Sequence, residues 1–187
     1  MVTASDVRIR RATAGDAVRL GIVGPAAYAD AYAYLWDDPV SFVQQLDTFG
    51  PSAFEELISR DGAYVWVAES AGDILGFLTM VAMSPDPIRR LDGGAELPRI
   101  YLVRPARRLR LGRRLLDVAI SEATAIGTSY VWLDVMASAD EARRAYMNWG
   151  FSELGSWVFQ RPVAPGMADM VVLAKSLVRP AEGTVTA

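Results

Sequence analysis

The segment from Ala95 to Val135 places the strongest constraint on how this chain folds. The apolar run Ala95–Val103 predicts a strand, and Tyr130–Val135 predicts a second, buried one. Between them, apolar residues recur at helical spacing until Gly127: Leu111, Leu115, Val118 and Ala119. A strand, helix and strand in succession join two parallel strands of one sheet, so we expect a βαβ crossover here.

Short helices and strands are predicted on both sides of this unit. Val7–Arg11 alternates as a strand, and Thr13 with Asp16 forms a capping box that opens a helix. We expect Pro25 to bend or restart that helix. The other predicted elements are two or three short helices within Ala26–Leu57, broken at Asp37–Pro39 and Gly50–Pro51, hairpin strands at Ala63–Glu69 and Ile74–Met83, a helix at Asp140–Trp149, and strands at Phe151–Phe159 and Met170–Lys175.

These elements predict one mixed α+β domain over residues 1–178. A chain of 187 residues with 52% hydrophobic content can bury one core and is short for two domains. The polar stretch 179–187 predicts a disordered tail. Glu69 and Asp73 interrupt the most apolar region, so no membrane span is expected, and we predict a soluble, cytoplasmic protein.

The composition restricts the chemistry. The chain has no cysteine and no histidine. Disulfides and thiolate metal sites are therefore excluded, and the most common general base and metal ligand are missing. Catalysis would depend on carboxylates, hydroxyls and backbone groups, and we expect no metal. A net charge of −3 argues against a nucleic-acid partner.

The turn that follows the first strand of the crossover is rich in arginine. Backbone N–H groups at a helix start lack partners and the helix dipole is positive there, so this turn attracts a phosphate, and arginines strengthen the attraction. A solvated basic helix start and a DNA-contacting patch are alternatives, and the run holds none of the aromatic residues that would favour the patch. Six arginines occupy eleven positions: Arg104, Arg107, Arg108, Arg110, Arg113 and Arg114.

The same turn resembles motif A of the GNAT N-acetyltransferases. In that family an extended strand precedes Gln or Arg, two residues, Gly, one residue, and Gly or Ala. Here Arg107–Gly112 is similar, with Leu115 and Leu116 at the family's usual spacing. Arg110 stands where the family usually has glycine, which lets the backbone approach a pyrophosphate closely. A helical backbone at Arg110 would remove this difficulty.

Two features downstream follow in the family's order. Trp132–Val135 resembles the fifth strand, and Ala139 stands where the family often has an asparagine that contacts the pantetheine arm. Ile9–Leu20 also looks like the family's first strand and helix, so the resemblance covers essentially the whole chain. Within the family the chain resembles polyamine acetyltransferases of the PaiA kind. The element A-x-x-x-Y-x-x-x-G-F is reproduced by Ala142, Tyr146, Gly150 and Phe151.

The resemblance implies a fold, a reaction and a cosubstrate. The fold is a twisted, mostly antiparallel sheet of about seven strands with one βαβ crossover and four to five helices. The reaction is direct transfer of an acetyl group from acetyl-CoA to a primary amine of a small molecule, a polyamine-like compound or a peptide N-terminus. Backbone amides between Ile100 and Val103 would hold the acetyl oxygen and the pantetheine amide. The residues assigned to acetyl-CoA are Leu102, Val103, Arg107, Arg108, Leu109, Arg110, Leu111, Gly112, Arg113 and Ala139.

Two residues are assigned to catalysis by the same resemblance. Glu96, eleven residues before Arg107, is the expected base, and burial would raise the pKa of its carboxyl toward neutrality. A solvent-facing glutamate at the strand edge is the alternative. Tyr146 is the expected acid for the departing thiolate, and packing of its ring against Ala142 and Trp149 is the alternative. Trp132 and Phe151 are assigned to the core.

An aromatic and acidic N-terminal stretch is the candidate wall of an acceptor pocket for a cationic amine. Helix packing beside a solvated acidic turn is the alternative. A degenerate domain that binds acyl-CoA or a partner without catalysis is the second functional hypothesis, and the sequence leaves the oligomeric state open, a homodimer included. The stretch consists of Tyr28, Asp30, Tyr32, Tyr34, Trp36, Asp37 and Asp38.

Overall fold

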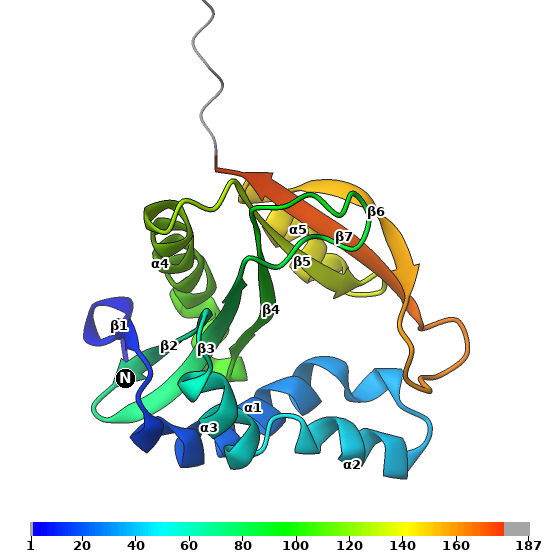
Figure 1. Cartoon of the computed structure of the whole chain (residues 1–187). Helices are drawn as coiled ribbons and strands as arrows, with labels where there is room; N and C mark the ends of the chain where they lie inside the picture. The colour runs from blue at the N-terminus through cyan, green and yellow to red at the C-terminus, as the bar shows by residue number, and fades with distance from the viewer. Residues whose placement is uncertain (1, 178–187) are drawn as a thin grey trace, which may run out of the picture.

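A computed structural model describes residues 2–177 and contains one seven-stranded sheet with five α-helices (Figure 1). The strands are β1 (Arg8–Arg11), β2 (Ala63–Ser70), β3 (Asp73–Ala82), β4 (Gly94–Leu102), β5 (Tyr130–Met136), β6 (Ser152–Val158) and β7 (Asp169–Ser176). The α-helices are α1 (Ala17–Tyr32), α2 (Pro39–Asp47), α3 (Pro51–Ser59), α4 (Leu111–Ala125) and α5 (Asp140–Asn148). Short 3₁₀ helices are η1 (Ala4–Asp6), η2 (Ala14–Asp16), η3 (Ala33–Leu35) and η4 (Arg104–Leu109).

The strands are ordered β1-β2-β3-β4-β5-β7-β6 across the sheet. The pair β4 and β5 is parallel, because helix α4 connects them across one face, and the other five neighbouring pairs are antiparallel. The predicted mixed fold with one βαβ crossover and seven strands is therefore confirmed. The predicted tail, 179–187, lies outside the described residues.

Two apolar layers cover the two faces of the sheet. On one face α4 packs on β2, β3, β4 and β5, with Leu111, Leu115 and Leu116 fully buried. On the other face α1 and α3 cover β2 and β3 around Phe54 and Phe77, whose ring centroids are 5.1 Å apart. Among residues 2–177, no helix combines the length and apolar character that crossing a bilayer requires.

Helix α1 runs through Pro25 without interruption, which differs from the restart allowed by the sequence. Proline removes one helical hydrogen bond, so packing must compensate. A Cβ on Gly21 would come within 2.6 Å of Pro51, and one on Gly24 within 3.1 Å of Phe49 and Phe54. Close packing of this glycine-bearing face on α3 and its preceding loop accounts for the continuity of the helix.

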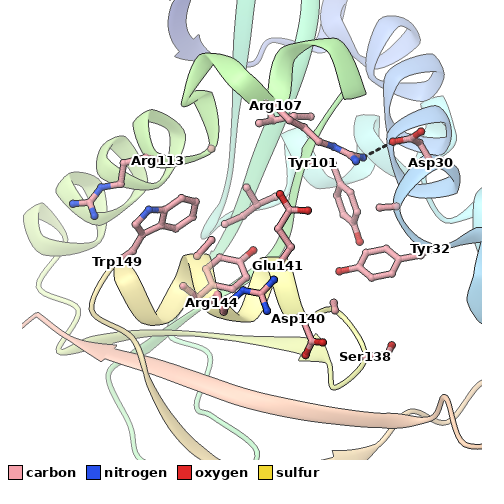
Figure 2. A pocket seen from close by; sticks show the side chains of 18 of the residues that line it. Asp30, Tyr32, Tyr101, Arg107, Arg113, Ser138, Asp140, Glu141, Arg144 and Trp149 are labelled. Carbon is pink, nitrogen blue, oxygen red and sulfur yellow. Dashed lines mark ion pairs between the residues drawn. The ribbon is translucent and has the colours of Figure 1, made fainter.

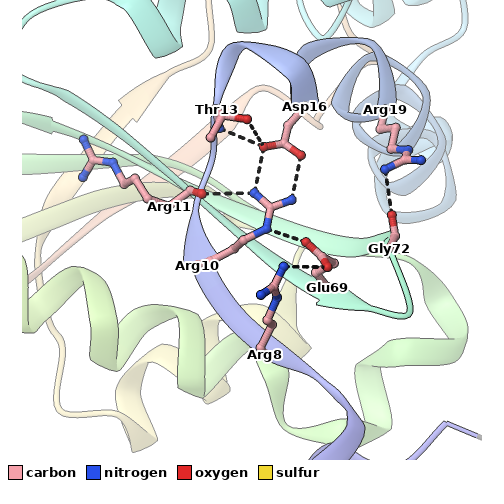
Figure 3. A network of polar contacts seen from close by, with 8 residues as sticks. All are labelled: Arg8, Arg10, Arg11, Thr13, Asp16, Arg19, Glu69 and Gly72. Atoms are coloured by element: carbon pink, nitrogen blue, oxygen red, sulfur yellow. Dashed lines mark hydrogen bonds and ion pairs between the residues drawn. The ribbon is translucent and has the colours of Figure 1, made fainter.

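An ion-pair network joins β1 to β2 and to the start of α1 (Figure 3). Arg10 donates to Asp16, with 2.7 Å between Nη2 and Oδ1, and its Nε donates to Glu69. Asp16 also accepts the Thr13 amide at 2.8 Å, so the predicted capping box is present. The Arg10 guanidinium holds the pKa of both carboxyls below their usual ranges.

Candidate active-site cleft

The central strands β4 and β5 pair over only part of their length. Their parallel register covers Gly94–Tyr130, Ala95–Val131 and Glu96–Trp132, after which the strands separate. Strand β4 continues to Leu102 and β5 to Met136, so each leaves an unpaired edge facing the other. A sheet that opens between two parallel strands offers backbone donors to a ligand without disrupting its ladder.

The amides of β4 at this opening can be assigned from the hydrogen bonds of its other edge. The Val103 amide donates to the Leu75 carbonyl of β3 at 2.9 Å, so that donor is occupied. Backbone N–H groups alternate between the two edges of a strand. The amides of Leu102 and Ile100 therefore face the gap between β4 and β5.

A cleft with a volume of about 650 Å³ lies beside this gap (Figure 2). Its walls come from the end of α1, the end of β4, the start of α4 and the length of α5. Six of the ten residues assigned to acetyl-CoA line it: Leu102, Arg107, Arg110, Gly112, Arg113 and Ala139.

The other four assigned residues do not line the cleft. Leu111 is fully buried and packs in the core, Leu109 packs against that core, and Arg108 is exposed. Val103 is half-buried against the same core. The two leucines orient the turn, because an apolar residue on each side of Arg110 packs toward the core and directs Arg110 outward.

Arg110 adopts a left-handed backbone conformation, with φ 56° and ψ 23°, and is the N-cap of α4. Arg110 therefore does not adopt the right-handed helical backbone that an arginine takes without strain. The left-handed region costs a non-glycine residue about 1–2 kcal/mol. In return, the turn exposes the first amides of α4, which have no acceptors within their helix.

The cationic side chains at this end of the cleft differ in their partners. Arg107 pairs with Asp30 of α1, with 2.7 Å between Nη2 and Oδ2 (Figure 2), and Arg113 pairs with Asp117 at 2.8 Å. Among the described residues, Arg110 has no ion-pair partner. Of the three arginines at this end of the cleft, Arg110 is therefore the one most available to an incoming anion.

Tyr146 lies on α5 and lines the cleft opposite the end of β4. Its ring contacts Trp149 and Phe151, with centroids 5.6 Å and 5.7 Å away. Burial raises the pKa of its phenol well above the usual value, so the hydroxyl stays protonated at neutral pH. It makes no hydrogen bond to any residue from 2 to 177, which leaves the proton free for donation.

Glu96 lies outside this cleft, on the sheet face that α1 and α3 cover. It lines a second cavity of about 330 Å³ and accepts a hydrogen bond from Ser84 Oγ at 3.2 Å. Burial, and the nearby charge of Asp134 on β5, raise the pKa of its carboxyl. The side chain is half-buried, so the alternative of a freely solvated glutamate does not describe it.

Several residues of the two cavities were not singled out from the sequence, among them Ser138, Asp140, Glu141 and Arg144 of the cleft. Trp149 and Tyr101 line the cleft, and Asp134 lies beside Glu96 with its own pKa raised by burial. The sequence did carry a signal for Asp134. Side chains two apart in a strand share a face, so Asp134 could have been placed on the same face of the sheet as Trp132.

The aromatic N-terminal stretch serves both packing and the cleft. Tyr28 is buried and accepts a hydrogen bond from Trp36 Nε1 at 3.1 Å, whereas Tyr32 and Tyr34 line the cleft. Tyr34 also forms a hydrogen bond with Ser138 across the cleft, at 3.0 Å. Asp38 caps α2 by accepting the Ser41 amide, so this acid has a structural role.

The site thus combines a mixed sheet that opens between two parallel strands with an arginine-rich helix start beside the opening. The sequence model of the acetyltransferase (GNAT) family matches residues 28–151. The chain therefore belongs to the GNAT acetyltransferase family.

Solved structures share the fold at low sequence identity. The PaiA N-acetyltransferase from Thermoplasma acidophilum, in complex with coenzyme A, aligns over 91% of this chain and 98% of its own, with a TM-score of 0.74 and 17% identity. An N-acetyltransferase from Staphylococcus aureus aligns over 92% and 99%, with a TM-score of 0.72 and 23% identity. The ribosomal-protein-alanine N-acetyltransferase from Brucella melitensis aligns over 91% and 99%, with a TM-score of 0.69 and 24% identity. No curated protein sequence matches the chain.

Proposed function

We propose that this protein is an N-acetyltransferase that uses acetyl-CoA to acetylate a primary amine directly. The observation that carries the proposal is the early end of the β4–β5 ladder at Glu96 and Trp132, which frees the Ile100 and Leu102 amides beside Tyr146. Membership in the GNAT acetyltransferase family supports the same reaction class.

The cleft fits the chemical character of acetyl-CoA. Its arginine end, Arg107, Arg110 and Arg113, would hold the diphosphate together with the first amides of α4. Its apolar wall of Leu102, Ala142 and Trp149 would pack on the pantetheine arm. Ala139 replaces the asparagine that the family often has at this position. The pantetheine arm would therefore depend on the β4 backbone amides for its hydrogen bonds. Acetyl-CoA would supply the acetyl thioester.

In this reaction Glu96 and Tyr146 each transfer one proton, and the free β4 amides stabilise the reacting carbonyl. Glu96 accepts a proton from the acceptor ammonium, directly or through water, because only the neutral amine is a nucleophile. The free β4 amides donate hydrogen bonds to the acetyl oxygen, where negative charge develops. Tyr146 donates its phenolic proton to the departing sulfur.

Thiol release from acetyl-CoA with a panel of primary amines tests this proposal. We expect release that depends on both the amine and the protein. A protein that neither binds coenzyme A in calorimetry nor releases thiol contradicts it.

The second candidate is a domain that binds acyl-CoA without transferring the acetyl group. Two features favour this candidate: the left-handed backbone of Arg110, and Ala139, which cannot make the contact that the family's asparagine makes. Coenzyme A binding without turnover on any amine of the panel is the outcome that selects this candidate.

A further inference from the structure

The second cavity combines Glu96, the proposed base, with polar groups to which the proposed reaction gives no role. It lies between the end of α3 and strands β3 and β4, and its volume of about 330 Å³ is at the lower end of small-molecule sites. Two carboxylates, two guanidinium groups and a hydroxyl line it: Glu56, Glu96, Arg60, Arg99 and Thr79.

A β-bulge in β4 brings Glu96 and Arg99 to this cavity. Residues three apart in a regular strand point to opposite faces. Here Val81 pairs with Glu96 and Thr79 pairs with Arg99, so β4 carries one residue more than β3 over this interval. The extra residue reverses the alternation and directs both side chains to the α3 face, where both line the cavity.

Arg99 is a largely buried cation that lacks a carboxylate partner. Its Nη2 donates to the Thr48 carbonyl at 2.9 Å, and its Cζ lies 4.3 Å from the centroid of the Phe49 ring. No ion pair links Arg99 to any acid within residues 2–177. A fork of five donors held over an aromatic ring retains donors for an anion that enters the cavity.

Thr79 is an independent sign that a polar group binds here. The residue is fully buried, and its Oγ1 has no hydrogen-bond partner. A buried hydroxyl without a partner is unfavourable unless a water molecule or ligand satisfies it. Because Thr79 lines the cavity directly across the ladder from Arg99, that partner would occupy the space beside the guanidinium.

We propose that the second cavity is the acceptor subsite and that it selects a small zwitterionic amino acid. The acceptor's carboxylate would lie between Arg99, Arg60 and the Thr79 hydroxyl, and its ammonium would lie against Glu96. This inference rests on the proposed function, since Glu96 removes the proton that leaves the amine. The two cavities share no lining residue, but consecutive residues of β4, Pro98–Arg99 and Ile100–Leu102, line one and then the other. The amine would therefore reach the thioester along that strand.

A matched acceptor pair tests the carboxylate requirement. L-Methionine and L-methioninamide share an amino group and a side chain, and only methionine carries the carboxylate. With rates corrected for the neutral-amine fraction, we expect kcat/KM to be at least about 10-fold higher for methionine. Arg60→Gln and Thr79→Val should each reduce this ratio, while Arg19→Gln, which removes an exposed charge elsewhere, should preserve it. Arg99 is not the first choice for substitution because its stacking on Phe49 supports the fold.

Calorimetry on the protein saturated with coenzyme A separates binding from turnover. Heat with methionine that is lost in Arg60→Gln supports the subsite, even if no amine is acetylated and the proposed reaction fails. Acetylation of methioninamide or putrescine at least as efficiently as methionine overturns the subsite while leaving acetyl transfer intact. The subsite is also overturned if methionine neither binds nor is acetylated.

Discussion

Arg107 of η4 is joined to Asp30 of α1 by an ion pair of 2.7 Å across the mouth of the cleft. Arg104 lies 3.8 Å from the same carboxylate. One acid on the α1 wall therefore attracts two arginines of the turn that we assign to diphosphate binding. The pair fixes the distance between the two walls and lowers the positive charge available to a ligand.

Asp30→Asn should strengthen coenzyme A binding. Arg107 would no longer be shared with a carboxylate, and the gain should be about 2- to 5-fold in Kd, which is the range of a partly exposed ion pair. Calorimetric titration with coenzyme A measures it. Asp37→Asn, an exposed acid of the same segment, is the matched control, and equal or weaker binding by Asp30→Asn contradicts the competition.

Tyr146→Phe should lower kcat by about 100-fold and leave acetyl-CoA affinity nearly unchanged. The ring and its contacts with Trp149 and Phe151 remain, and only the proton donor is removed. Steady-state thiol release together with a binding titration separates the two effects. Tyr64→Phe, on β2 beside Trp66, is the control. Full activity in Tyr146→Phe would reject the acid assignment.

Arg110→Gly should be more stable to urea than Arg110→Ala by about 1 kcal/mol. Both variants remove the same charge, so the comparison isolates the cost of a Cβ at φ 56°. Coenzyme A affinity should fall by a similar factor in both, because both lose the unpaired guanidinium. Equal stability of the two variants would show that the left-handed backbone is not strained.

The activity should decline on the acidic side as the Glu96 carboxyl takes up a proton. Burial and the charge of Asp134 raise the pKa of Glu96, so the acidic limb of kcat/KM should lie above the usual glutamate range. Asp134→Asn removes the like charge, which should lower the pKa of Glu96 and move the limb to lower pH. Repeating the profile with amines of different basicity identifies the limb as the protein's own. A limb that follows the amine, or stays in place in Asp134→Asn, contradicts the assignment.

Asp16→Asn should destabilise the protein at neutral pH by about 2 kcal/mol, because Arg10 loses a buried partner. The pKa of Asp16 is lowered in the folded state, so its contribution is present above the pKa of the unfolded chain, about 3.9, and is lost as the pH falls below that value. Urea unfolding from pH 7 to pH 3 should show the difference from the unsubstituted protein shrinking below about pH 4. The exposed acid Asp92, substituted by Asn, should give no such trend, and a constant difference for Asp16→Asn would contradict the network's ionic character.

The order of strands and helices could be predicted because it depends on local patterns. The helical spacing of Leu111 and Leu115, and the turn residues between β2 and β3, act within a few positions of themselves. Pro25 is the exception. The helix continues past it where Gly21 packs closely on Pro51 and Gly24 on Phe49, which are distant in sequence. Gly112 and Tyr146, which the family resemblance assigned to the site, both line the cleft.

The sequence by itself determined the elements, the single βαβ crossover and the arginine-rich turn, since periodicity and capping are properties of short segments. Only the tertiary structure decided which side chains share a cavity. The opening between β4 and β5, and the bulge that turns Arg99 to the side of Glu96, arise from pairing among strands far apart in the chain. Pairing register is a long-range property, and a shift of one residue moves a side chain to the other face of the sheet.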